Sequence, residues 1–274
     1  MKEEIFILVK TYPTLSKKYF ELVCTAGINR KGEWRRIYPI PFRQLSDIEK
    51  YKKYQWIEID IIRNRSDVRK ESYRVSPQTE IKVLSTIDTD KDKIWRTRKE
   101  LIFANTKVYT NLEEIIKKAN NENELSLAIF KPNEITDFTY EKDSEEWDEK
   151  KLRAIEADKQ QLKLFEEYKR EIEIVNKLPY KFYYHFKDDA GKESKLMIED
   201  WEIGQLYWNC LKRKSEKEAI NDIITKYKDD FINNKDIYFF LGTTRQYHGW
   251  VKNPFVITGV FYPPKESTQQ ILKF

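Results

Sequence analysis

Glycine is scarce in this chain, which has only seven glycines among 274 residues. Phosphate-cradling loops need glycine, because their backbone must approach the phosphate closely. The nearest match is Gly27-x4-Gly32, but Glu33-Trp34 follows where Lys and then Ser or Thr are required. We therefore reject a nucleoside-triphosphate loop at this position.

Cysteine and histidine are also rare, with two of each. Cys24 and Cys210 are far apart, as are His185 and His248. A disulfide framework needs more cysteines, and a structural zinc site needs ligands clustered at short spacings. The sequence therefore predicts no bound metal, no cofactor and no cysteine nucleophile.

No long hydrophobic run is present. The chain starts MKEEIFILVK, which is charged and then strand-like, and no stretch approaches 18 apolar residues. We expect a soluble, cytoplasmic protein with no membrane partner.

What the chain does contain is charge and aromatic rings, at 35% and 14% of residues. Disordered polyampholytes are poor in aromatic residues, so the rings indicate an ordered core. The net charge of +5 is uneven: residues 1–100 hold 23 Lys and Arg against 15 Asp and Glu (+8), and residues 101–274 hold 28 against 31 (−3). Ten of the fourteen arginines lie in the first hundred residues, which favours a polyanionic partner for that part.

Short alternating segments dominate the chain. Strands are expected at 4–11, 19–27, within 33–42, and at 54–63 and 79–87. In the second half they are expected within 127–142, on both sides of a proline, and at 180–187, 194–198, 237–244 and 254–263. Asp200 and the pair Ser215-x-x-Glu218 are typical helix starts, and 147–175 carries an amphipathic stripe. We expect an α+β protein of two small OB-like barrels of about five strands each, 1–128 and 129–274, with helices inserted in the second at 147–175 and 200–230.

The amino-acid sequences of several segments resemble those of a known family. KTYPTLSKKYFELVCTAG, RRIYPIPFRQL, DVRKESYRV, LMIEDWE, FFLGTTR and PFVITGVFYPP are similar to blocks of dual OB-domain proteins, a largely uncharacterised prokaryotic family. The resemblance implies two OB-like barrels, nucleic-acid binding by analogy of fold, and an association with mobile elements and anti-phage defence. It carries over no catalytic residues.

The main candidate site is a basic, aromatic stretch around the third expected strand. Single-strand-binding barrels combine a cationic groove with rings on which bases stack. Trp34 and Arg36 share one face of an alternating strand, with Tyr38 if the strand continues. The alternative is that the rings are core and the arginines only solubilise a hairpin. The residues of this stretch are Arg30, Lys31, Trp34, Arg35, Arg36, Tyr38 and Arg43.

A second basic stretch follows the strand at 54–63 and is expected to line the same groove. Its alternative is a solvated loop in which Asp67 and Glu71 pair locally with the arginines. The candidate residues are Arg63, Arg65, Arg69, Tyr73 and Arg74.

Three other features have weaker functional interpretations. Glu199, Asp200 and Glu202 resemble a metal-binding cluster, although Asp200 fits better as a helix cap. Asp60 or Asp67 with Glu80-x-Lys82 imitates a nuclease pattern. His248, in a loop with Arg245 and Trp250, is expected to be a hydrogen-bonded loop histidine rather than a proton-transfer group.

The sequence therefore favours a non-enzymatic protein that binds nucleic acid, single strands above all, with weak sequence specificity and strong salt dependence. The nearly neutral second barrel is free for a partner protein. Two alternatives remain: a metal-dependent nuclease, and a scaffold or sensor subunit that binds a protein or a nucleotide.

Overall fold

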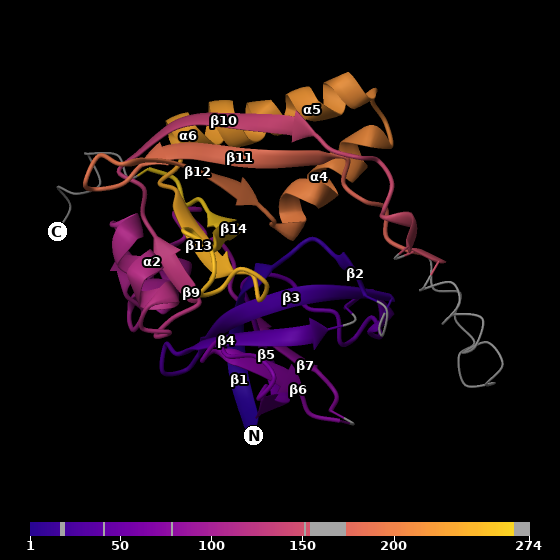
Figure 1. Cartoon of the computed structure of the whole chain (residues 1–274), viewed down its shortest axis with the longest axis vertical. Coiled ribbons are helices and arrows are strands. Elements are labelled where there is room, and N and C mark those ends of the chain that lie inside the picture. The colour runs from indigo at the N-terminus through magenta and orange to yellow at the C-terminus, as the bar shows by residue number, and fades with distance from the viewer. Residues whose placement is uncertain (17–19, 41, 78, 151, 154–173, 266–274) are drawn as a thin grey trace.

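The structure, a computed structural model, describes every residue except 17–19, 41, 78, 151, 154–173 and 266–274. Figure 1 shows a small barrel with a second sheet and its helices stacked against it. No helix among the described residues is long and apolar enough to cross a membrane.

The first half forms a closed five-stranded barrel. Its strands are β1 (Lys2–Lys10), β3 (Phe20–Asn29), β4 (Trp34–Ile40), β5 (Gln55–Arg63) and β6 (Ser72–Val75). They run in the order β1-β3-β4-β6-β5, and β1 also pairs with β5, which closes the barrel. Only β4 and β6 are parallel within it. This closed five-stranded arrangement is consistent with an OB-like architecture.

Three short elements complete this half. Strand β2 (Thr14–Ser16) pairs with β3, and β7 (Lys82–Thr86) pairs with β5. The 3-10 helix η1 (Phe42–Gln44) follows β4. The basic segment at 64–77 contains β6, which pairs antiparallel with β5, so β5 and β6 form a hairpin.

The barrel interior follows from strand alternation. Ile57, Ile59 and Ile61 are buried inside it, as the period of two predicts. Gly27 on β3 lies so close to β1 that a Cβ there would stand 2.1 Å from the Phe6 carbonyl oxygen, so only glycine fits.

The second half does not close. Its seven strands form an open sheet in the order β10-β11-β12-β14-β13-β9-β8, and nothing pairs the two edge strands β10 and β8 among the described residues. The expected second barrel is therefore not seen; the described residues form an open sheet. The strands are β8 (Val108–Tyr109), β9 (Leu127–Phe130), β10 (Glu134–Lys142), β11 (Tyr180–Lys187), β12 (Glu193–Ile198), β13 (Tyr238–Thr243) and β14 (Phe255–Phe261).

The division between the halves falls earlier than expected. Because β8 already belongs to the second sheet, that sheet starts near residue 108 rather than at 129. Helix α1 (Arg96–Phe103) precedes it, and α2 (Leu112–Asn120) follows it.

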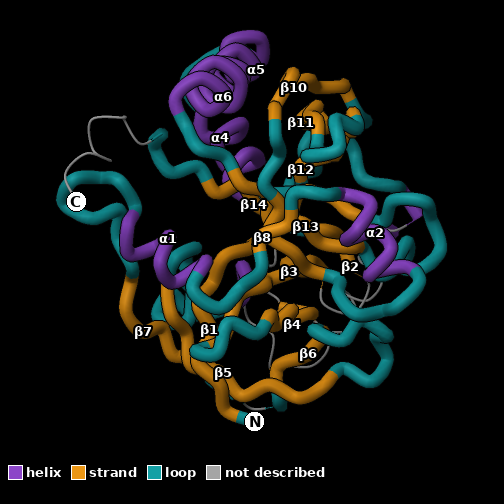
Figure 2. The backbone as a smooth tube through the Cα atoms, turned by 90° about the vertical axis from the view of Figure 1, so that its left-hand side faces the viewer, coloured by secondary structure: helices purple, strands orange, loops and turns teal. Residues whose placement is uncertain are grey.

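Helix starts are placed where their capping residues predict. The Asp200 carboxylate accepts from the backbone N–H of Glu202 at the start of α4 (Trp201–Leu211). Ser215 and Glu218 form a capping box on α5 (Glu216–Ile224), which continues through the π-helix η2 (Thr225–Asp230) into α6 (Phe231–Asn234). Figure 2 shows these helices grouped beside β10–β12. Most of the helix expected at 147–175 lies outside the described residues.

Aromatic packing holds the second sheet to its helices. Phe138 stacks on Phe182 and on Tyr227 of η2, while Tyr184 stacks on Phe239. These rings are almost fully buried, so they form the core that composition predicts.

The two halves share a core. One apolar cluster joins barrel residues such as Phe6 and Trp56 to Phe240 and Phe261 of the second sheet. A buried ion pair adds to it, with Lys53 Nζ 2.7 Å from the Asp200 carboxylate. The halves are therefore continuous in packing.

Candidate nucleic-acid interface

The face of β4 that points away from the barrel interior carries the candidates Trp34, Arg36 and Tyr38, and it is turned toward the second sheet. Trp34 is half-buried, with its ring edge-on to Phe240 at 6.2 Å. Arg36 is only 2% exposed, and its Nη2 donates to both the carbonyl (2.8 Å) and the hydroxyl (3.0 Å) of Ser126. Tyr38 is half-buried, and burial raises the pKa of its phenol. Arg36 thus ties the barrel to the second sheet.

Arg69 is the second buried arginine. Its Nε and Nη2 donate to the two carboxylate oxygens of Asp67 at 2.9 and 2.6 Å, and its Nη1 donates to the Thr243 carbonyl. Burial alone would raise the pKa of Asp67, but the hydrogen bonds and charge of Arg69, aided by the Ser72 hydroxyl, hold it at about 2. The local ion pair that was the alternative for this loop is therefore present, between Arg69 and Asp67. Arg69 also bridges to the second sheet through Thr243.

Other candidates are engaged on the barrel surface. Arg35 pairs with Glu3 and Glu33, each at 2.7 Å, and its guanidinium lies 5.0 Å from the centre of the Tyr73 ring. The guanidinium N–H groups of Arg35 that could bind a phosphate are therefore already used by carboxylates, and the guanidinium also lies against a ring.

Arg30 and Arg63 are exposed but also partnered. Arg30 lies 3.7 Å above the Trp56 ring and pairs with Glu4 at 2.6 Å. Arg63 donates to the Ser72 carbonyl at 2.5 Å.

The remaining candidates are exposed but dispersed. Lys31 lies in the β3–β4 turn, Arg43 in η1, Arg65 in the β5–β6 loop and Arg74 on β6. The structure does not bring the twelve candidates together on one open face.

A different exposed surface forms where the 64–70 loop meets the β13–β14 connection. Arg245 Nη2 donates to the Ser66 carbonyl at 2.7 Å, and Asn123 donates to the Val68 carbonyl at 3.2 Å. Trp250 is 87% exposed there and Tyr247 is 46% exposed. We call this the loop surface; its exposed residues are Arg65, Val68, Lys70, Arg245, Tyr247, Trp250 and Lys252.

His248 is buried beneath the loop surface and forms hydrogen bonds with two of its neighbours. It is 4% exposed, with Nδ1 3.1 Å from the Thr243 hydroxyl and Nε2 2.9 Å from Asn123 Oδ1. Burial lowers its pKa, and the positive charges of Arg69 and Arg36 lower it further. The expectation of a hydrogen-bonded loop histidine is therefore confirmed.

Sequence reasoning noted the pieces of this surface but did not join them. The available signal was a tryptophan between Gly249 and Val251 in a polar loop, with Arg245 and Lys252 beside it. Its meeting with the 64–70 loop depends on strand order, which the sequence does not reveal.

The two acidic alternatives are placed differently. Asp200 is fully buried, where it caps helix α4 and pairs with Lys53. The helix-cap interpretation of Asp200 is therefore confirmed. Asp60, Glu80 and Lys82 do meet around a surface cavity of about 470 Å³ with Glu58. No group of three or more His, Cys, Asp or Glu suited to a metal is found within the described ranges.

Comparison with known families divides the chain at the same place as the fold. Residues 1–104 match a family model described as "Domain of unknown function (DUF8758)", and residues 108–274 match another, "Domain of unknown function (DUF8757)". No curated protein matches the chain. Because the second match covers more than half of its residues, the chain belongs to the family described as Domain of unknown function (DUF8757).

Proposed function

We propose that this protein binds single-stranded nucleic acid through the loop surface, with weak sequence specificity. The observation that carries the proposal is the 87% exposure of Trp250 on a loop that also presents Arg245 and Lys252. A tryptophan is rarely left so exposed, and an exposed ring beside cations is a platform on which a base can stack.

The charges around Trp250 favour a phosphate backbone. Arg65, Lys70 and Lys252 are exposed, and none of the three forms an ion pair with a described carboxylate. The nearby Glu122 and Glu124 already pair with Lys117 and Lys118. Free cations flanking a ring satisfy both requirements of single-strand binding.

The position of the loop surface on the barrel agrees with this function. OB-like barrels bind ligands with the face of their second and third strands and with the loop between the fourth and fifth. Here the second sheet packs on β3 and β4 through Arg36 and Trp34, so that face is occupied. The loop at 64–71 joins the fourth and fifth barrel strands and keeps Arg65, Val68 and Lys70 exposed.

This proposal also relies on the resemblance to dual OB-domain proteins, which implies a nucleic-acid ligand and a role in prokaryotic defence. A cytoplasmic location, expected from the hydropathy of the sequence, is part of the same proposal. The residues to which the proposal assigns nucleic-acid binding are those of the loop surface, rather than Arg35 and Arg36 of β4.

Fluorescence anisotropy with labelled single-stranded DNA, single-stranded RNA and duplex DNA tests the proposal. We expect the single strands to bind more tightly than the duplex, and Trp250→Ala to weaken single-strand binding by about 1–3 kcal/mol, the value of one stacked base. Tyr140→Ala, which removes an exposed ring from the second sheet, is the control.

The proposal fails if none of the three ligands binds at low salt, or if Trp250→Ala binds as the wild type does. Incubation with Mg²⁺ and Mn²⁺ should leave the oligonucleotides intact; cleavage would favour the nuclease alternative.

A further inference from the structure

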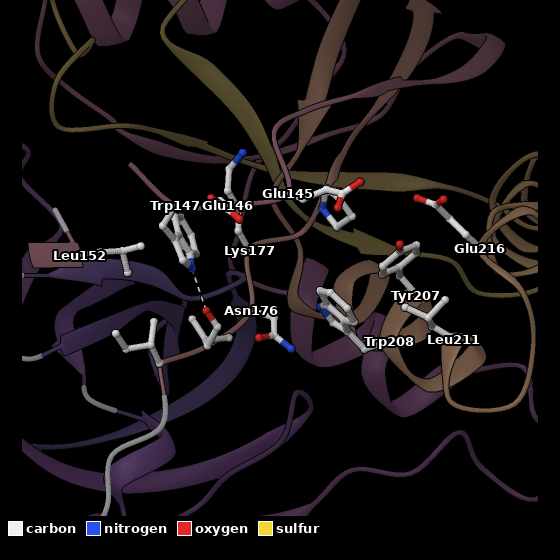
Figure 3. A pocket seen from close by; sticks show the side chains of 13 residues that line it. Glu145, Glu146, Trp147, Leu152, Asn176, Lys177, Tyr207, Trp208, Leu211 and Glu216 are labelled. Atoms are coloured by element: carbon white, nitrogen blue, oxygen red, sulfur yellow. Dashed lines mark hydrogen bonds between the residues drawn. The ribbon is translucent and has the colours of Figure 1, made fainter. Parts of the chain in front are cut away.

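A second concave site lies away from the loop surface, beside helix α4. This cavity of about 600 Å³ is lined by residues before and after the 154–173 segment and by α4 and the first residue of α5 (Figure 3). Its volume is in the usual range for a small-molecule site, roughly 300–1,000 Å³.

Aromatic rings form much of the cavity lining. Trp147 Nε1 donates to the Val175 carbonyl at 2.7 Å, and Trp208 Nε1 donates to the Tyr12 hydroxyl at 2.6 Å. Because both indole N–H groups are already used, these two side chains offer the cavity carbon and π-electron surface rather than donors. Tyr207 is held edge-on to Trp208, with ring centres 4.9 Å apart.

Acidic side chains outnumber basic ones among the described residues of the lining, which include Glu145, Glu146, Glu216 and Lys177. Lys142, beside the cavity, lies 3.1 Å from Glu145 and 3.9 Å from Glu216, whereas Glu146 forms no ion pair with a described cation. Lys177 is held by Asp143 at 3.0 Å and by the Ser144 hydroxyl at 2.5 Å.

The carboxylates converge on one phenol. Burial raises the pKa of Tyr207, and the negative charges of Glu216 and Glu145 raise it further, so both acids act on the same part of the cavity. Glu216 is oriented by the Tyr180 hydroxyl, which donates to it at 2.7 Å.

We infer that this cavity binds a small organic cation, an ammonium group attached to an apolar body. Ring faces attract cations through their quadrupole, and this attraction strengthens when the cation is desolvated. Glu146 supplies an unpaired carboxylate as the counter-charge, and the acidic lining disfavours phosphates and carboxylates. The cavity is therefore opposite in charge to the loop surface and binds a different class of ligand.

The test compares choline with its neutral carbon isostere, 3,3-dimethyl-1-butanol, by isothermal titration calorimetry on the full chain. Choline should bind about tenfold more tightly than the isostere, because only the cation gains from the rings and carboxylates. Glu145→Gln with Glu146→Gln should weaken choline binding several-fold and leave the isostere unchanged.

Glu100→Gln with Glu193→Gln removes the same charge from exposed positions elsewhere and should bind choline as the wild type does. A circular dichroism melt of each variant separates loss of the site from loss of the fold. Equal affinity for choline and the isostere, no choline binding, or an unchanged choline affinity in the Glu145/Glu146 variant would each overturn the inference. None of these results depends on nucleic-acid binding.

Discussion

Burial, rather than residue type, decides what each arginine of the first hundred residues does. Arg36 and Arg69 are 2% and 4% exposed and donate to backbone carbonyls of the second half. Arg65 is exposed in the β5–β6 loop. The same side chain therefore serves as a structural tie in two places and as a candidate phosphate contact in the third.

Arg36→Ala should lower the free energy of unfolding by about 2–3 kcal/mol, because the Ser126 carbonyl loses a charged donor inside the protein. Arg65→Ala should change it by less than about 0.5 kcal/mol, as exposed substitutions usually do. Urea denaturation measures both. Equal stability of the two variants would mean that the Arg36 contacts do not hold the halves together.

The Asp67 carboxyl should make stability depend on pH in the acid range. Its pKa is about 2 in the folded protein, below the ordinary value of 3.8, so its contribution is present above about pH 4 and is lost as the pH falls toward 2. The shift corresponds to about 2 kcal/mol. In Asp67→Asn, stability between pH 5 and 2 should fall less steeply in urea titrations; an unchanged slope would exclude Asp67 as its source.

At the scale of elements, sequence periodicity predicts much of the structure. The alternation in QWIEIDIIR identifies the buried isoleucines, and Asp200 and Ser215 mark where α4 and α5 begin. Alternation also groups Trp34, Arg36 and Tyr38 on one face. It does not tell whether that face meets solvent or another sheet, since amphipathic residues such as Trp and Arg are used at both. The candidate site was therefore only partly predictable.

Helix α4 packs unusually closely on the end of β1. A Cβ at Gly204 would lie 2.3 Å from the Tyr12 ring. Gly204→Ala should therefore destabilise the protein despite the roughly 1 kcal/mol that alanine gains over glycine in a helix.

A double-mutant cycle isolates this contact. In a Tyr12→Ala background the ring is gone, so Gly204→Ala should become neutral or stabilising in thermal melts. The same destabilisation in both backgrounds would show that the Gly204–Tyr12 contact is not responsible.

At the scale of the whole molecule, the sequence predicts the first barrel and not the open second sheet. The second sheet depends on pairings between distant segments, such as the parallel contact of Ile198 with Ile257 and the insertion of β9 beside β13. Local patterns of apolar and polar residues are the same for open and closed sheets. Which strands become neighbours is decided by tertiary packing.

The shared core predicts that the two halves unfold together. Phe6, Trp34 and Trp56 belong to a cluster that also contains Phe240 and Phe261, so they would lose part of their packing if the barrel stood alone. We expect one calorimetric transition for the full chain, and for residues 1–106 alone a much lower melting temperature with binding of a hydrophobic dye. Two separate transitions in the full chain would contradict this.

The most direct test of the central claim is the salt dependence of oligodeoxythymidine binding, measured by anisotropy for the wild type and two charge-matched variants. Arg65→Ala with Lys252→Ala removes two cations from the loop surface. Arg213→Ala with Lys217→Ala removes two exposed cations, one from the α4–α5 connection and one from the first turn of α5. We predict that the first variant binds more weakly and that its slope of log affinity against log salt is shallower by about 1.4, the value for two phosphate contacts on a single strand. The second variant should match the wild type. An unchanged slope in the Arg65/Lys252 variant, or equal losses in both, would contradict the assignment of nucleic-acid binding to the loop surface.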